Sequence, residues 1–181
     1  ARRLAPNVGT GLVQFSGEVG ATNSLGLIDI TGGLDLDANI TGAAGLTVSL
    51  TSNLGANVTT SGNQTYTGRA TLSSDVTLTG LNVNFNNQII GGDNALTVTG
   101  NFDLDGAASG ISSLSVSGSS DLGANVTTSG TQTYSGATTL SAATTLAGSS
   151  INLNAVTGGS NALTITGDLD LDGDIAGVTS L

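Results

Sequence analysis

The residues with the most potential for chemistry form an acidic run near the end of the chain, Asp168-Leu169-Asp170-Leu171-Asp172-Gly173-Asp174. The run follows the D-x-D-x-D-G order that opens a calcium-binding loop, where a hard cation needs several oxygen ligands close together. The twelfth position of such a loop is Thr179, where an EF-hand requires Glu. One hypothesis is therefore a weak calcium site, and the alternative is a strand with Leu inward and solvated Asp outward. The candidate ligands are Asp168, Asp170, Asp172 and Asp174.

Threonines recur two residues apart, a spacing that places both hydroxyl groups on one face of a strand. The pairs are Thr65/Thr67, Thr77/Thr79, Thr97/Thr99 and Thr164/Thr166. Some β-solenoid antifreeze proteins present a flat array of stacked Thr pairs to ice, so ice binding is one alternative function. The other interpretation is that Thr is simply a good polar strand former.

Asparagines also occur at alternate positions in two stretches of the chain. They are Asn82, Asn84, Asn86, Asn87, Asn152 and Asn154. Stacked side-chain amides form ladders in repetitive β structures, and asparagine also suits turns. We predict ladder or turn positions, and a glycan site is the alternative.

Catalysis is not predicted from these residues. A polysaccharide lyase needs a base and cations beside a sugar acid, yet the body of the chain contains Arg69 as its sole base and no His. A glycoside hydrolase uses a unique pair of carboxylates, whereas the acids here are copied every 67–68 residues. We expect a protein that is not an enzyme and has no cofactor other than the possible calcium.

The charge balance narrows the range of partners. The chain has 13 acidic and three basic residues, and its net charge is −10. This balance argues against binding to nucleic acid or to anionic lipid.

No apolar run is long enough to span a membrane, so membrane insertion is not expected. There is no Cys for disulfides or thiolate metal sites. Cys-free chains rich in Thr, Asn and Gly are common among bacterial surface proteins, which predicts an extracellular or cell-surface location.

A long internal repeat organises the chain. Residues 54–121 form one full repeat, after which the sequence starts again, so that Tyr66 corresponds to Tyr134, 68 positions on. The predicted divisions are an irregular N-terminal leader (1–10), a partial repeat (11–53), the full repeat (54–121) and a nearly full repeat (122–181). The chain stops at Leu181 in the middle of a repeat. This predicts either a longer protein or a stack that another subunit continues.

Apolar residues alternate with a period of two inside the repeat. Ala95–Gly100 reads A-L-T-V-T-G and Ser113–Gly118 reads S-L-S-V-S-G, both typical of short strands. Hairpin dipeptides are scarce, and aromatic residues make up only 3% of the chain, which suits a thin aliphatic core. The predicted fold is all-β, a parallel β-solenoid whose coils stack about 4.8 Å apart.

The number of coils in a repeat is left open by the sequence. Three coils of about 22 residues would return matching residues to the same face, which is the arrangement we favour. Glycines near intervals of 18–20 residues, such as Gly62, Gly80, Gly100 and Gly118, also allow between three and four shorter coils.

Two motifs bear a family resemblance. Thr65-Tyr66-Thr67-Gly68 and Thr133-Tyr134-Ser135-Gly136 resemble the autotransporter-associated strand repeat. The longer unit, with its N-A-L-T-V-T-G and N-F-D-L-D-G-A blocks, is similar to the arrays of filamentous-haemagglutinin-like bacterial adhesins, over about residues 11–181.

The resemblance implies a right-handed β-helix that serves as a non-catalytic stalk of a secreted or surface-anchored exoprotein. It further implies adhesion to a glycan or surface receptor, although no residue here identifies one. The expected partner is another copy stacked head to tail, or the continuation of a longer chain. A filament subunit of a calcium-dependent extracellular matrix or surface layer is an alternative.

Overall fold

The computed structural model of the chain describes residues 2–181, which contain strands and connections but no helix. The strands are β1 (Asn7–Phe15), β2 (Leu25–Leu36), β3 (Ile40–Val48), β4 (Ser52–Leu54), β5 (Val58–Thr60), β6 (Gln64–Tyr66), β7 (Ala70–Leu72), β8 (Val76–Phe85), β9 (Ile89–Ile90), β10 (Leu96–Leu104), β11 (Ala108–Ile111), β12 (Leu114–Val116), β13 (Ser120–Leu122), β14 (Val126–Thr128), β15 (Thr131–Leu140), β16 (Thr144–Thr157), β17 (Leu163–Leu171) and β18 (Ile175–Ala176).

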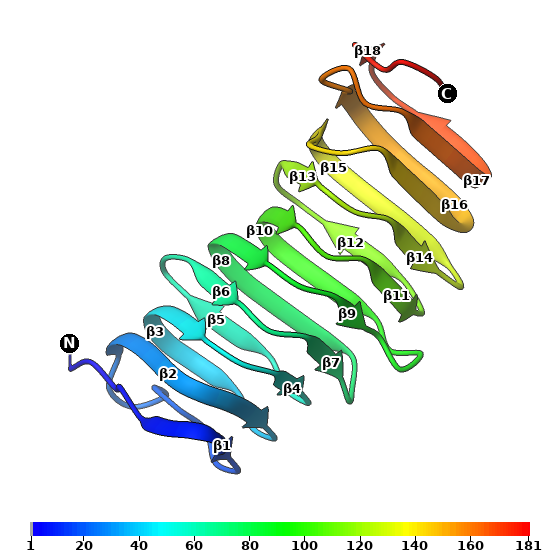
Figure 1. Ribbon diagram of the computed structural model, residues 1–181. Coiled ribbons are helices and arrows are strands. Elements are labelled where there is room, and N and C mark those ends of the chain that lie inside the picture. Colours follow the sequence, from blue (N-terminus) through cyan, green and yellow to red (C-terminus); the bar gives the residue numbers. More distant parts are fainter. Residues whose placement is uncertain (1) are drawn as a thin grey trace.

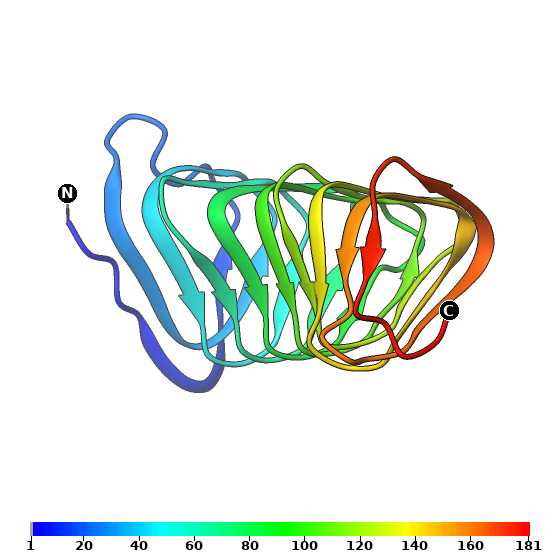
Figure 2. The ribbon, with the colours of Figure 1, turned by 90° about the horizontal axis from the view of Figure 1, so that it is seen from above.

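All 18 strands belong to one sheet of parallel pairs that winds into a solenoid of about nine turns (Figure 1). Ladder partners are typically 18 residues apart, as for Leu96 and Leu114. Seen from above, the coils form an elongated stack with the N-terminus at one end and the C-terminus at the other (Figure 2). The prediction of an all-β parallel solenoid is confirmed.

Each coil has three faces, which we call A, C and B in the order in which the chain visits them. In one coil, β4 lies on face A, β5 on face C and β6 on face B, and β7 then stacks on β4. The longer strands bend around a corner and contribute to two or three faces. For example, β10 pairs with β12 on face C through Leu96–Val98 and with β13 on face B through Phe102–Leu104.

The core is a narrow column of aliphatic side chains along the axis. Alternation places every second residue of a strand inward, so Leu54, Leu72 and Val98 are almost completely buried. Aromatic rings fill the middle of the column, where Tyr66 stacks on Phe85 with centroids 4.8 Å apart. Burial of this repeated apolar surface is the main stabilising contribution. Each coil buries its apolar side chains against its two neighbouring coils.

The three-coil interpretation of the repeat is wrong. Because ladder partners lie 18 to 20 residues apart, a 68-residue repeat covers more than three coils and fewer than four. Tyr66 therefore lies on face B, paired with Val48, whereas its counterpart Tyr134 lies on face C, paired with Val116. Successive repeats place equivalent residues on different faces of the rod. The alternative of between three and four shorter coils is the correct one.

A buried amide reinforces the point where a coil becomes longer. The Gln64 side chain is fully buried, and its Nε2 donates to the carbonyl oxygens of Val58 (3.2 Å) and Thr79 (2.9 Å). Its Oε1 accepts a hydrogen bond from the Tyr66 hydroxyl at 2.9 Å. Val58 and Thr79 belong to successive coils, so the glutamine links the two.

The same arrangement recurs on another pair of faces. Gln132 Nε2 donates to the carbonyl oxygens of Val126 (3.2 Å) and Ala147 (2.8 Å), and the Tyr134 hydroxyl donates to Gln132 Oε1 (3.0 Å). Val126 pairs with Leu146, 20 residues on rather than the usual 18. The amide supplies a donor at the longer coil, where the backbone ladder is irregular.

We expect Gln64→Leu to lower the free energy of unfolding by about 2 kcal/mol, because it leaves the Tyr66 hydroxyl and a backbone carbonyl buried without partners. Chemical denaturation followed by circular dichroism measures the change. Gln14 is exposed, and Gln14→Leu is the matched control, with an expected change of about 0.5 kcal/mol or less. Equal losses in the two variants would contradict this role for Gln64.

Three hydroxyl groups in the core have no hydrogen-bond partner: Ser52, Ser120 and Thr138. Thr138 is almost completely buried, and Val has nearly the same shape without the polar atom. We expect Thr138→Val to raise the free energy of unfolding by about 1 kcal/mol. Thr144 Oγ1 donates to the Ala142 carbonyl at 3.0 Å, so Thr144→Val should instead lower it by a similar amount. Denaturation curves that change in the same direction for both variants would refute this assignment.

The N-terminal segment takes part in the solenoid. Leu4 forms a parallel bridge with Ile28, and β1 starts at Asn7, inside the segment that the sequence predicts to be irregular. The Arg3 guanidinium forms an ion pair with Asp29. Ala1 lies outside the described residues, and residues 4 and 7–10 extend the ladder of the first coil.

Candidate functional surface

The candidate functional surface consists of the outward side chains of the three faces, which alternate with the buried core residues. On each face these side chains stack on their ladder partners in the neighbouring coils, about 4.8 Å apart. Side chains of one kind form a continuous file only where several successive coils carry the same residue type. The three faces differ in this respect.

The acidic runs lie on three different faces. Asp35 is on face A, where Asn53 Nδ2 donates to Asp35 Oδ1 at 2.9 Å. Asp103 is on face B, and Asp170 is on face C next to Asn152. The repeat length causes this separation, because each repeat moves its acidic run to another face. One common acidic face is therefore absent from the part of the chain that the structure describes.

The four candidate calcium ligands lie at the C-terminal end of the rod. Asp168 and Asp170 belong to β17 and are exposed, with the side chains of Leu169 and Leu171 alternating between them. Asp172 and Asp174 follow the strand, and Asp172 N donates to the Leu153 carbonyl at 3.0 Å. Across residues 2–181, no group of three or more Asp, Glu, His or Cys side chains is arranged to hold a metal ion.

Two carboxylates stack directly on face B. Asp103 pairs with Asp121 in the next coil, and both line a hollow with Asn84 and Asn101. Partial burial raises the pKa of the Asp103 carboxyl, and the negative charges of Asp105 and Asp121 raise it further. Asp121 Oδ1 is buried and has no hydrogen-bond partner. The two stacked carboxylates therefore repel each other, and no cationic side chain lies between them to offset the repulsion on the described surface.

We expect Asp103→Asn to stabilise the fold at pH 7, by less than about 1 kcal/mol because the group is partly solvated. A raised pKa in the folded state means that the ionised carboxylate opposes folding above that pKa. The difference from the unchanged chain should shrink as the pH falls through the folded pKa, and it should vanish below the unfolded value near 4. Unfolding free energies across pH 3–7 test this. A constant difference at all pH values would contradict it.

Asparagine ladders occupy a corner between faces C and B. Asn82 Nδ2 donates to Asn63 Oδ1, and Asn101 Nδ2 donates to Asn82 Oδ1, each at 3.0 Å. Asn154 Nδ2 donates to the Ser135 carbonyl at 3.0 Å. The ladder prediction is confirmed for Asn82, and Asn63 and Asn101 extend that ladder. These amides link neighbouring coils along the edge of the rod.

Of the predicted threonine pairs, two come together on face C. Thr77 pairs with Thr97, and Thr79 pairs with Thr99. Thr65 and Thr164 lie on faces B and A, so their pairs do not join this array. Ser115 pairs with Thr97 and with Thr133, so two serine-containing pairs, Ser115/Ser117 and Thr133/Ser135, continue the array in the next coils. Sequence reasoning missed these two pairs because their coil spacing differs from the repeat spacing.

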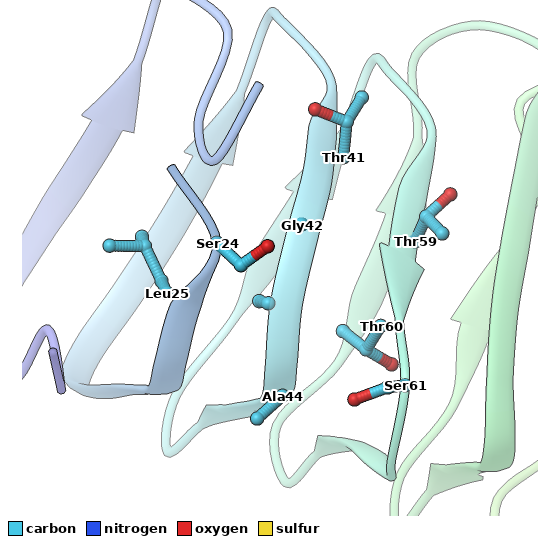
Figure 3. Close-up of a pocket in the computed structure, with 9 residues that line it drawn as sticks. Ser24, Leu25, Thr41, Gly42, Ala44, Thr59, Thr60 and Ser61 are labelled. Carbon is cyan, nitrogen blue, oxygen red and sulfur yellow. The ribbon is translucent and has the colours of Figure 1, made fainter. Parts of the chain in front are cut away.

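A shallow hollow of about 430 Å³ lies near the N-terminal end, between β2, β3 and β5 (Figure 3). Hydroxyl groups and small side chains line it, and none of its residues titrates near neutral pH. The side chains of Thr41 and Thr59 lie on neighbouring strands at its rim in Figure 3. The lining residues are Ser24, Leu25, Thr41, Gly42, Ala43, Ala44, Thr59, Thr60 and Ser61.

Comparison with known proteins gives no match, whether against protein-family models, curated proteins or solved structures. Residues 2–181 contain no helix with the length and apolar character needed to cross a membrane.

Proposed function

We propose that this chain is a non-catalytic structural rod, a stalk or filament segment that holds other groups away from a bacterial surface. The observation that supports this most directly is the uninterrupted stack of coils, in which inward positions from Ile28 to Leu163 are filled by one continuous core. Such a stack has a backbone ladder along its whole length, which makes it stiff and resistant to proteolysis.

An extracellular or cell-surface location forms part of this proposal. It is supported by the resemblance of Thr65–Gly68 and Thr133–Gly136 to adhesin repeats and by the absence of Cys from the sequence. Adhesion to a glycan or surface receptor would then involve the outward side chains of the rod. Binding of the labelled chain to a glycan array and to intact cells tests this part separately from the mechanical role.

Stretching of single molecules between the two ends tests the mechanical role. We expect a series of force peaks from coils that detach one after another, because each coil contacts only its neighbours. The repetitive core predicts similar forces for successive peaks. A chain that extends at low force without peaks would overturn the proposal of a load-bearing rod.

Head-to-tail association is a further part of the proposal. The last strands, β17 and β18, form ladders with β16 only. Leu163 N at the start of β17 also donates to the Ser180 carbonyl at 3.0 Å, whereas Leu169 and Leu171, further along β17, are partly exposed. An exposed strand edge pairs readily with another strand. Electron microscopy over a concentration series, with and without calcium, should reveal end-to-end fibres. A species that remains monomeric at high concentration would contradict association, and fibres that do not depend on calcium would contradict a calcium-dependent filament.

A further inference from the structure

Face C carries a paired array of hydroxyl groups across four successive coils, which we call the hydroxyl array. Its two files run parallel to the rod axis, and each coil contributes one residue to each file. The array consists of Thr77/Thr79 on β8, Thr97/Thr99 on β10, Ser115 on β12 with Ser117 directly after that strand, and Thr133/Ser135 on β15. All eight residues carry a hydroxyl group, and none carries a charge.

The buried residues beneath the array fix its geometry. Leu78, Val98, Val116 and Tyr134 pair in register from β8 to β15, and all four are buried. The register is continuous across this part of face C, and the irregularity in the β8–β10 ladder begins only after Thr99. The hydroxyl groups are therefore held in position before any partner binds, which lowers the entropy cost of binding.

The array forms a nearly rectangular lattice. Neighbouring coils are about 4.8 Å apart, and the two hydroxyl residues of one strand are about 6.7 Å apart, twice the rise per residue. A partner that engages many of these groups at once must itself repeat at similar spacings in two directions. The oxygen atoms at the surface of an ice crystal form a lattice with repeats of this order.

The hydroxyl groups are available to such a partner. Within residues 2–181, the hydroxyls of Thr77, Thr79, Thr97 and Thr99 take part in no intramolecular hydrogen bond. Ser117 and Thr133 differ, because Ser117 Oγ accepts from Gly100 N at 3.1 Å and Thr133 Oγ1 accepts from Asn152 Nδ2 at 3.5 Å. Each Thr also presents a methyl group, so the surface combines hydrogen bonding with apolar contact. Charged groups, which retain water strongly, are absent from the array.

The chemistry of the face favours ice over a carbohydrate. Sugar-binding surfaces commonly place aromatic rings against the ligand, because the flat face of a ring packs against the C–H groups of a sugar. Tyr66, Tyr134, Phe85 and Phe102 are all buried in the core. The array offers repeated hydroxyl and methyl groups without an exposed ring. We propose that the hydroxyl array of face C is an ice-binding surface. This function goes beyond the structural role, and the two are tested independently.

The other two faces do not offer an equivalent array in the described structure. On face B the corresponding positions include Asn84, Asp103 and Asp121 in successive coils. On face A, Ile90 and Ala147 interrupt the outward file. The proposal therefore predicts that binding depends on one face of the rod.

A single ice crystal grown slowly in a solution of the fluorescently labelled chain tests the proposal, together with the thermal hysteresis of the unlabelled chain. We expect the unchanged chain to be incorporated into the ice and to produce hysteresis. Thr97→Tyr places a bulky ring in the centre of the array and should abolish both effects. Thr47→Tyr is the matched control, because Thr47 is a half-buried outward residue of face B, and it should retain both.

Circular dichroism establishes that both variants are folded before they are compared. Exclusion of the unchanged chain from ice would overturn the proposal. Equal loss of ice binding in folded Thr97→Tyr and Thr47→Tyr would also overturn it, because binding would not be specific to face C. Adsorption to crystalline cellulose without incorporation into ice would overturn it in favour of a polysaccharide ligand.

Discussion

Gly100→Ala is expected to lower the free energy of unfolding by about 3 kcal/mol or more. Gly100 has a φ of 135°, a conformation that L side chains rarely adopt, and a Cβ at this position would overlap the carbonyl oxygen of Gly80. The residue lies where β10 turns the corner from face C to face B, at the irregularity in its ladder with β8. The backbone cannot move away, because the neighbouring coil is hydrogen-bonded on the same side.

Gly17→Ala is the matched control for this prediction. A Cβ at Gly17 would have no atom within 4 Å, so we expect a change of about 0.5 kcal/mol or less. Guanidinium denaturation followed by far-ultraviolet circular dichroism compares the two variants. Similar midpoints and slopes for both would show that the corner at Gly100 does not require glycine.

The second large effect is expected for Phe85→Ala, at about 3–5 kcal/mol. The Phe85 ring lies between Tyr66 and Phe102, with centroid distances of 4.8 Å and 6.1 Å, and it is almost completely buried. Its removal leaves a cavity in a narrow core that few other side chains can fill. Coils on both sides then lose contact, so the loss should affect the middle of the rod.

Hydrogen exchange measured on Phe85→Ala locates the loss. Protection should fall most in β6, β8 and β10, whereas the coils around β15 and β16 should be affected less, because coupling between coils is local. Phe85→Leu keeps more of the apolar volume and should cost less than Phe85→Ala. Uniform loss of protection along the rod would show that the solenoid unfolds as one unit instead.

The strands themselves could be predicted from the sequence, because alternation is a local property of each segment. Ala95–Gly100 contains the first part of β10, and Ser113–Gly118 contains the whole of β12. In both, the predicted apolar residues point inward. The parallel pairing also followed from the long repeat and the scarcity of hairpin turns. What could not be predicted was the stacking of strands from different parts of the repeat.

The difficulty is that the repeat and the coil have different lengths. Gly32, Gly100 and Gly167 occupy equivalent positions of successive repeats and all have positive φ, yet they lie at three different corners of the rod. A sequence comparison aligns these glycines with one another, whereas the fold stacks Leu96 on Leu114 from the same repeat. The same difference in length places the acidic runs on three faces and divides the threonine pairs among the faces.

The buried glutamines were also missed, although a signal for them existed. Gln64 and Gln132 each precede a tyrosine by two residues, at an inward position of an alternating strand. A polar residue at an inward position needs partners, and the tyrosine hydroxyl provides one. The backbone carbonyls that complete the arrangement belong to other strands, so only the three-dimensional structure reveals them.

A disulfide cross-link tests the three-faced stack of 18-residue coils most directly. Thr97 and Ser115 pair on neighbouring coils, at a spacing of about 4.8 Å that a disulfide can span. The chain has no Cys of its own, so mild oxidation of a Thr97→Cys/Ser115→Cys variant can form only this bond. We predict a rapid cross-link here and none in Thr97→Cys/Ser119→Cys, whose positions would be neighbours in a 22-residue coil. A cross-link in the second variant alone would contradict the account.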